Sequence, residues 1–201
     1  MELFFGGAAG EVTGSKHVLK TAHASVLLDC GMSQGHHNDR ERNTSFLFQP
    51  QQLSAVIISH AHLDHVGMLP LLVKLGFRGP IFSTPATMEL AELILLDAAK
   101  LQEQDAEFAA RHHFQEIHEP LYTMDDIPPV MQLFRPTPYA RSGEWTDAAN
   151  GIKFRFLDAG HILGSAITEL HITENGRTHS LVFTGDLGRP RMPLLRDPEF
   201  P

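Results

Sequence analysis

Residues 59–67, SHAHLDHVG, follow the apolar run AVIIS (residues 55–59) and place three histidines and one aspartate within six positions. If that run is a strand that ends at Ser59, the side chains of His60 and His62 point the same way, because alternate residues of an extended chain share a face. Asp64 and His65 then open a helix and point to a neighbouring position. Imidazole and carboxylate groups are ligands that zinc accepts in proteins. The stretch therefore predicts a site for two divalent ions.

Three other apolar runs end in the same way. They are SVLLDCG (residues 25–31), FRFLDAGH (residues 154–161) and SLVFTGD (residues 180–186). Each has the length and the β-branched or aromatic content of a strand, and each ends near a glycine. Asp29, His161 and Asp186 thus join the histidines at strand ends, and a carboxylate such as Asp186 can bridge two ions.

Helices are expected between these strands. One should run from Asp64 to a stop at Gly76, and another should begin at Pro85 with Thr84 as its N-cap. A third, after Thr123, should have Asp125 and Asp126 in its first turn. The apolar face of the second helix is expected to contain Leu90, Leu93, Ile94 and Leu101. That of the third helix is expected to contain Ile127, Val130, Met131 and Phe134. Helices that alternate with strands predict an α/β protein with its site along one rim of the sheets.

Composition narrows the class of protein. The chain has 201 residues, a net charge of −8, 13 histidines and one cysteine. The acidic balance argues against a broad basic face for nucleic acid, and a lone Cys30 excludes an internal disulfide and fits a reducing compartment. We found no signal peptide and no apolar run long enough for a membrane span, so a cytoplasmic protein is expected.

Several other residues have competing interpretations. Asp29 could be a metal ligand, but we favour a supporting role in which it orients a ligand histidine. Cys30 is expected to be a small buried side chain rather than a nucleophile. The glycine-rich residues 6–15 lack the Gly-Lys-Ser/Thr ending of a phosphate-binding loop, so they are expected to form turns. A supporting role for them at the edge of the site stays open. His36 and His37 could overhang the site. Five further histidines should be exposed: His112, His113, His118, His171 and His179.

In combination, five motifs resemble the N-terminal part of the metallo-β-lactamase-fold β-CASP nucleases, the group that contains ribonuclease J-like enzymes and bacterial RNA-processing exonucleases. The motifs are GAAGEVTGSKH (residues 7–17), LLDCG (27–31), HAHLDH (60–65), AGHILGSA (159–166) and FTGDLG (183–188). The resemblance covers essentially the whole chain. It implies a four-layer αββα sandwich, incomplete at the C-terminus, with residues 1–201 as the metallo-β-lactamase domain and with the β-CASP domain and the closing segment absent.

The resemblance also implies roles for residues. The counterparts of His60, His62 and His161 hold one zinc ion, those of Asp64 and His65 hold a second, and that of Asp186 bridges the two. Manganese is an alternative metal. Asp64 would place or deprotonate the attacking water, and Asp29 would support the site by hydrogen bonding. These two aspartates are our candidate catalytic residues.

The expected function is metal-dependent hydrolysis of phosphodiester bonds in single-stranded RNA, impaired in a chain of this length. A homo-oligomer is compatible with this expectation. Two alternatives stay open: a hydrolase of the same fold that cleaves a small thioester or lactone, and a metal-binding fragment without catalysis. The 95 residues between His65 and His161 favour the nuclease, because we expect a shorter spacer in the small-molecule hydrolases. The acidic net charge of the chain favours the metal-binding fragment without catalysis.

Overall fold

The computed structural model describes residues 1–35, 38–112, 119–141 and 143–201. Its first sheet has six strands in the order β1-β2-β3-β4-β5-β6, antiparallel as far as β3 and parallel from β3 to β6. These strands are β1 (Glu2–Phe5), β2 (His17–Lys20), β3 (Ser25–Leu28), β4 (Ala55–Ile57), β5 (Ile81–Ser83) and β6 (Phe134–Pro136).

The second sheet is antiparallel, in the order β10-β9-β8-β7. Its strands are β7 (Thr146–Ala149), β8 (Ile152–Asp158), β9 (Ala166–Glu174) and β10 (Arg177–Phe183). Strands β9 and β10 form a hairpin whose turn contains Asn175 and Gly176, both with positive φ, as a tight two-residue turn requires.

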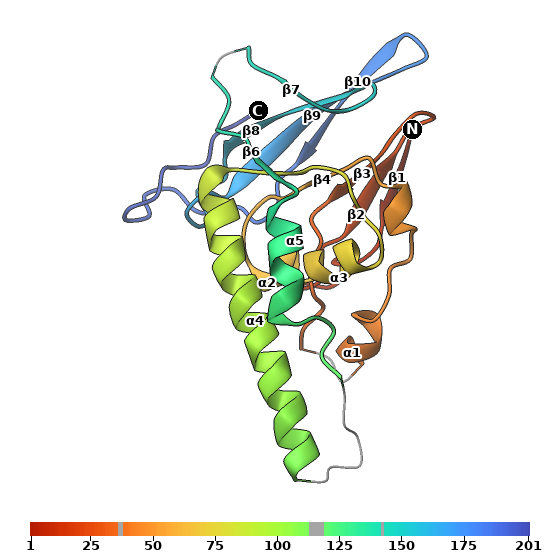
Figure 1. The fold of residues 1–201 in the computed structure, drawn as a ribbon. Helices are drawn as coiled ribbons and strands as arrows, with labels where there is room; N and C mark the ends of the chain where they lie inside the picture. The colour runs from red at the N-terminus through yellow and green to blue at the C-terminus, as the bar shows by residue number, and fades with distance from the viewer. Residues whose placement is uncertain (36–37, 113–118, 142) are drawn as a thin grey trace.

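The helices are short apart from one. They are α1 (Asp39–Arg42), α2 (Leu63–Val66), α3 (Leu69–Lys74), α4 (Pro85–Arg111) and α5 (Ile127–Met131), with 3₁₀ turns η1 (Pro50–Gln52) and η2 (Met124–Asp126). Figure 1 shows α4 extending well beyond the sheets. No helix within the described ranges is long and apolar enough to cross a membrane.

The two sheets stack face to face, and alternation along each strand separates two cores. In β3, Val26 and Leu28 face the second sheet, where they join Phe154 and Phe156. Leu27, between them, faces the other way and joins the cluster formed with the helices. Every strand of this sheet that is buried on both faces therefore reads as a continuous apolar run.

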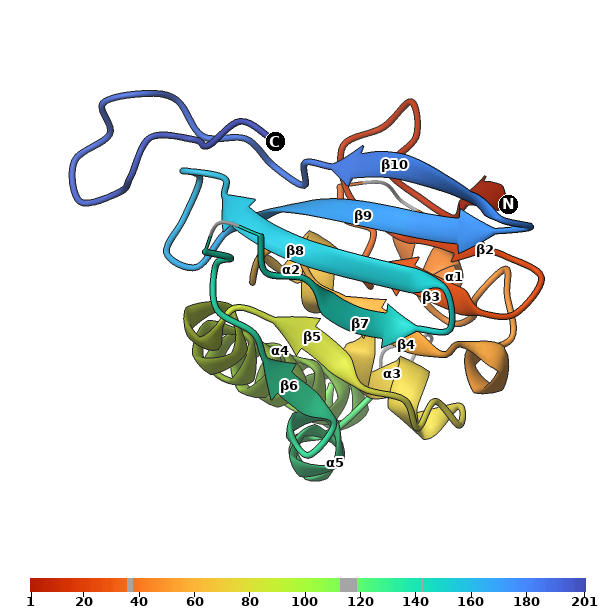
Figure 2. The same cartoon turned by 90° about the horizontal axis from the view of Figure 1, so that it is seen from above.

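Three of the four expected layers are present among the described residues: helices, the six-stranded sheet and the four-stranded sheet. In Figure 2 the four-stranded sheet faces the viewer, and no helix of the described part of the chain covers that face. The mixed α/β class is as expected, and so is the incomplete sandwich.

Two helix predictions were wrong in detail. The helix expected from Asp64 to Gly76 is broken after Val66, and α3 starts at Leu69, with Pro70 in its first turn. Because proline lacks an amide hydrogen, it suits the start of a helix better than its interior. The stop at Gly76 is confirmed by its φ of +105°.

The apolar face expected for α4 was wrong in three of its four residues, whereas Leu90 is partly buried and packs against the core. Leu93 and Leu101 are 64% and 51% exposed, and Ile94 is 37% exposed. The buried residues of α4 are mainly small: Thr87, Ala91, Leu95, Ala98 and Ala99. In the third helix, Ile127 and Val130 are buried as expected, but Phe134 lies on β6 rather than on a helix.

Candidate metal centre

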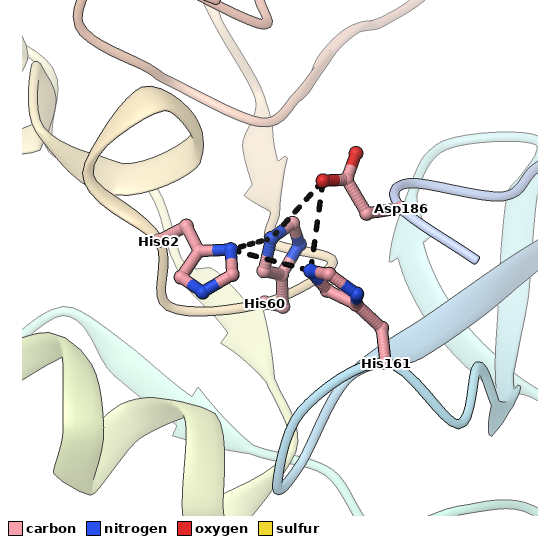
Figure 3. A group of neighbouring side chains, drawn as sticks. All are labelled: His60, His62, His161 and Asp186. Atoms are coloured by element: carbon pink, nitrogen blue, oxygen red, sulfur yellow. Dashed lines mark hydrogen bonds and ion pairs between the residues drawn. The ribbon is translucent and has the colours of Figure 1, made fainter. Parts of the chain in front are cut away.

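Four side chains from three strand ends meet at one rim of the two sheets. His60 and His62 follow β4, His161 follows β8, and Asp186 follows β10. One ligand atom from each lies within 4.8 Å of all the others, and Figure 3 shows the three rings and the carboxylate turned toward a common centre. The convergence expected from the strand-end pattern is therefore present in the structure. This group can hold a metal ion.

The distances within the group scatter around the edge length of a tetrahedral metal site. The Nδ1 atom of His62 lies 2.9 Å from the Nε2 atom of His60 and 3.3 Å from that of His161. The Oδ2 atom of Asp186 lies 3.9 Å from Nε2 of His60 and 3.6 Å from Nε2 of His161. Tetrahedral bonds of 2.0–2.1 Å place neighbouring ligand atoms about 3.3–3.4 Å apart. Three nitrogens and one oxygen at these spacings form a donor set that suits zinc.

The second oxygen of Asp186 faces a different group. Its Oδ1 atom lies 3.5 Å from Nε2 of His65, and the same nitrogen lies 3.7 Å from Oδ2 of Asp64. The Asp186 side chain is 48% exposed, whereas that of His65 is 5% exposed. Asp186 thus lies between two sets of donors and has one oxygen turned to each. This arrangement is what a bridging carboxylate requires.

The start of α2 brings His62, Asp64 and His65 together. His62 is the N-cap of the helix, in extended conformation, and its carbonyl accepts the amide hydrogens of His65 at 2.9 Å and Val66 at 3.0 Å. Gly31 permits this packing, since a Cβ atom there would lie 1.6 Å from the carbonyl oxygen of Asp64. The glycine of LLDCG is thus required by close backbone contact.

Asp29 is fully buried behind the histidines and has a left-handed backbone, with φ of +57°. Its Oδ2 atom lies 2.6 Å from Nδ1 of His65 and accepts a hydrogen bond from the hydroxyl of Ser59 at 2.9 Å. Its Oδ1 atom accepts the amide hydrogen of Ser59 at 2.8 Å. A carboxylate only accepts hydrogen bonds, so Nδ1 of His65 carries its hydrogen and Nε2 is left free to face Asp64 and Asp186.

Electrostatics differ among the histidines. Burial, together with the neighbouring His65, His62 and His161, lowers the pKa of His60 to about 2. The pKa of His161 is also lowered, mainly by burial. Burial acts in the same direction on His65, but its hydrogen bond to Asp29 and the nearby carboxylates raise its pKa overall. His60 is therefore neutral at physiological pH, which is the form that binds metal.

The loop that carries His161 is fixed by hydrogen bonds between side-chain hydroxyls and backbone groups. The hydroxyl oxygen of Ser165 accepts the amide hydrogens of His161 at 3.0 Å and Ile162 at 3.2 Å. The carbonyl oxygen of Gly164 lies 2.7 Å from Oγ1 of Thr84 and 2.8 Å from Oγ1 of Thr87. Because Thr84 is also the N-cap of α4, the first turn of that helix holds the His161 loop.

Two serines at the site were not singled out from the sequence. Ser59 lies inside the quoted motif, and Ser15 lies in the glycine-rich loop, where its hydroxyl donates to Oδ2 of Asp29 at 3.3 Å. The amide of Ser15 also donates to the carbonyl of Asp64 at 2.9 Å. The loop thus touches the site, as the expected supporting role requires. The serine that precedes the first histidine was the signal that could have been used.

The histidines that were expected to overhang the site or to be exposed lie away from the centre or outside the described residues. His112 and His179 are exposed, whereas His171 is half-buried and stacks on Trp145 with ring centroids 3.8 Å apart. His171 is therefore not a free surface side chain. His36, His37, His113 and His118 fall outside the residues that the structure describes. Cys30 is fully buried, and burial raises the pKa of its thiol, so it is an inert core side chain.

Comparison with known sequences agrees with this geometry. A profile described as a metallo-beta-lactamase superfamily domain matches residues 18–186. Ribonuclease TTHA0252 of Thermus thermophilus is 39% identical over 195 residues, which are 97% of this chain and 40% of that protein. Transcription termination factor FttA of Methanosarcina mazei is 36% identical over 185 residues, which are 90% of this chain and 26% of that protein. The chain therefore spans less than half the length of either relative.

Solved structures with the same fold are more distant in sequence. The native FEZ-1 metallo-beta-lactamase from Legionella gormanii superposes with a TM-score of 0.51 at 17% identity, covering 90% of this chain and 61% of its own. MEM-A1, a subclass B3 metallo-beta-lactamase isolated from a soil metagenome library, superposes with a TM-score of 0.50 at 17% identity, covering 86% of this chain and 57% of its own. At such identities the likeness shows the fold alone. A divalent metal is what this fold and this His/Asp group together imply.

Proposed function

The chain belongs to the metallo-beta-lactamase superfamily, and from this premise we propose that it supplies the metal centre of a hydrolase that cleaves RNA phosphodiester bonds. The convergence of His60, His62, His161 and Asp186 is the observation that carries the proposal. RNA is suggested by the names of the relatives, a ribonuclease and a transcription termination factor. We further propose single-stranded RNA as the substrate and the cytoplasm as the location. A homo-oligomer stays a prediction.

We assign the ligands in two sets. His60, His62 and His161 would hold one zinc ion, Asp64 and His65 would hold a second, and Asp186 would bridge them. The spacing of the first set, close to a tetrahedron edge, supports zinc there. The second set is richer in oxygen, so manganese is an alternative ion at that position. The two oxygens of Asp186, one turned to each set, support two ions rather than one.

When bound, such ions lower the pKa of a coordinated water to about 7 and offset charge on phosphoryl oxygens. Asp64 is the residue that we propose holds that water or accepts its proton, because its side chain is 19% exposed and lies beside His65. A carboxylate placed in this way typically contributes about 10²–10⁴-fold to the rate. Asp29, fully buried, acts through His65 and does not reach the substrate.

We also propose that residues 1–201 are the N-terminal part of the metallo-β-lactamase domain of a longer β-CASP-type nuclease. The greater length of both relatives supports this proposal. A chain of net charge −8 has little capacity to hold a polyanion by charge. We therefore expect the 201 residues alone to cleave RNA slowly, and a form extended with the corresponding region of a relative to be faster by orders of magnitude.

The experiment compares cleavage of labelled single-stranded RNA by both forms, with zinc or manganese added, against cleavage of a thioester. His62→Ala tests the centre, and His179→Ala is the matched control, because His179 is an exposed histidine on β10. RNA cleavage that His62→Ala abolishes and His179→Ala retains is the expected result. Thioester cleavage without RNA cleavage would instead establish the small-molecule hydrolase. Metal binding without either activity in both forms would establish the non-catalytic fragment.

A further inference from the structure

Ser59 lies where the ends of four strands meet. It follows β4 and is 1% exposed. Its amide donates to Oδ1 of Asp29, after β3, at 2.8 Å, and its carbonyl accepts the amide hydrogen of Ala166, at the start of β9, at 2.8 Å. The backbone of Ser59 thus joins the six-stranded sheet to the four-stranded sheet. Its position within the rim is fixed independently of its side chain.

The hydroxyl of Ser59 determines which nitrogen of His60 carries hydrogen. Its oxygen lies 2.9 Å from Oδ2 of Asp29 and 3.0 Å from Nδ1 of His60. A serine hydroxyl has one hydrogen, and the carboxylate can only accept, so the hydroxyl donates to Asp29. It must then accept from His60. The Nδ1 atom of His60 therefore carries the hydrogen, and the Nε2 atom has a free lone pair.

That free lone pair belongs to the atom that faces the centre. The Nε2 atom of His60 lies 2.9 Å from Nδ1 of His62 and 3.9 Å from Oδ2 of Asp186. The other tautomer of His60 would place a hydrogen there and block coordination until it was lost. Hydrogen bonds of this kind, from the far nitrogen of a ligand histidine, orient the ring and raise its basicity.

The side chain of Ser59 also lies against the turn that carries Asp186. A Cβ atom built on Gly185 would lie 2.6 Å from Cβ of Ser59 and 2.7 Å from its Oγ. Gly185 has φ of +51°, which also favours glycine. The small serine and the glycine together let the end of β10 approach the end of β4, so that Asp186 reaches the histidines.

We propose that Ser59 is a positioning residue of the metal centre, which fixes the tautomer of His60 through Asp29 and provides the space in which Gly185 places Asp186. The inference rests on the metal-binding part of the proposed function and does not depend on RNA as the substrate.

The test compares Ser59→Ala with Ser15→Ala. Both variants remove a buried hydroxyl that donates to Oδ2 of Asp29, but only Ser59 also contacts a histidine ring among the described residues. Zinc affinity is measured by competition with a chelator, and unfolding of the metal-free variants by circular dichroism. We expect Ser59→Ala to lower zinc affinity by about ten- to a hundredfold, and Ser15→Ala to lower it far less. Equal affinities in the two variants would overturn the inference.

A second measurement does not depend on whether Ser59→Ala folds. Long-range ¹H–¹⁵N spectra of the metal-free, unsubstituted protein at neutral pH report the tautomer of each histidine. We expect His60 to carry its hydrogen on Nδ1, and a hydrogen on Nε2 would overturn the inference. If the unsubstituted protein binds no zinc, the metal site itself fails, whereas zinc binding with the wrong tautomer leaves that site intact and rejects only the role of Ser59.

Discussion

The Nδ1 atom of His65 lies 2.6 Å from the Oδ2 atom of Asp29, and both side chains are buried. This contact connects the end of β3 to the first turn of α2. It leaves the other ring nitrogen of His65 free on the side of Asp64 and Asp186. Asp29 therefore orients a candidate ligand from behind, through a short hydrogen bond to a carboxylate.

Asp29→Asn tests this contact with little change of shape. Asparagine tolerates the left-handed φ of +57°, so the backbone need not move. Loss of the charge should weaken the basicity and the orientation of His65, and we expect zinc affinity to fall about ten- to a hundredfold. Asp126→Asn, a matched change at the capping box of η2, should leave affinity unchanged. Equal affinities in both variants would show that Asp29 has no part in the site.

Gly185→Ala should displace Asp186. The new methyl group would meet Ser59, and the left-handed backbone adds a cost of about 1–2 kcal/mol. Gly176→Ala is the control, because Gly176 has φ of +73° but no atom within 4 Å of its would-be Cβ. We expect both variants to lose stability in urea unfolding of the metal-free protein, and Gly185→Ala to lose more, because its methyl group also meets Ser59. Only Gly185→Ala should lose zinc affinity, and a loss in both would assign the effect to backbone strain.

The first turn of α4 should matter for stability through the His161 loop. Thr84→Val removes both the N-cap of α4 and a hydroxyl close to the carbonyl of Gly164. Thr87→Val removes only a hydroxyl. A lost N-cap typically costs about 1 kcal/mol, so Thr84→Val should be less stable than Thr87→Val by about that amount. Denaturant midpoints measure the difference, and the reverse order would contradict this description of the loop.

Lys16 should make the stability of the fold depend on pH at the alkaline end. It is 5% exposed, its Nζ donates to the carbonyl of Gly31 at 2.7 Å, and burial lowers its pKa below the ordinary value. Between the folded and unfolded pKa values the unfolded chain binds more protons, so stability rises with pH there. Relative to Lys16→Met, the unsubstituted protein should therefore gain stability from neutral pH to about pH 10. A constant difference in unfolding free energy would contradict this.

The grouping of the candidate ligands was predictable because much of its pattern is local in the sequence. His60 and His62 lie in the short connection that follows β4, and Asp64 and His65 lie in α2, so all four are close together in the sequence as well as in space. The strand expected to reach Ser59 ends at Ile57. His161 and Asp186 follow apolar runs of the same kind. The supporting position of Asp29 behind a ligand histidine was predicted as well, because Asp29 also follows an apolar run. Ser15 was less predictable, because it reaches the site only through tertiary contacts.

The face of α4 was not predictable from hydrophobicity. Ala91, Ala98 and Ala99 are buried where α4 packs near α2, α5 and β6, whereas Leu93 is 64% exposed. Small side chains permit a close approach between elements, and their low hydrophobicity hides the contact from a search for large apolar residues.

The central claim is that His60, His62, His161 and Asp186 hold a transition metal. The most direct measurement is a calorimetric titration of the metal-stripped protein with zinc at neutral pH, with His62→Ala and His161→Ala as tests and His179→Ala as the control. We predict that the unsubstituted protein and His179→Ala bind at least about one ion per chain, as three histidines and a carboxylate should, and that the two test variants bind far more weakly. A folded protein that takes up no zinc, or equal affinity in all four proteins, would contradict the account.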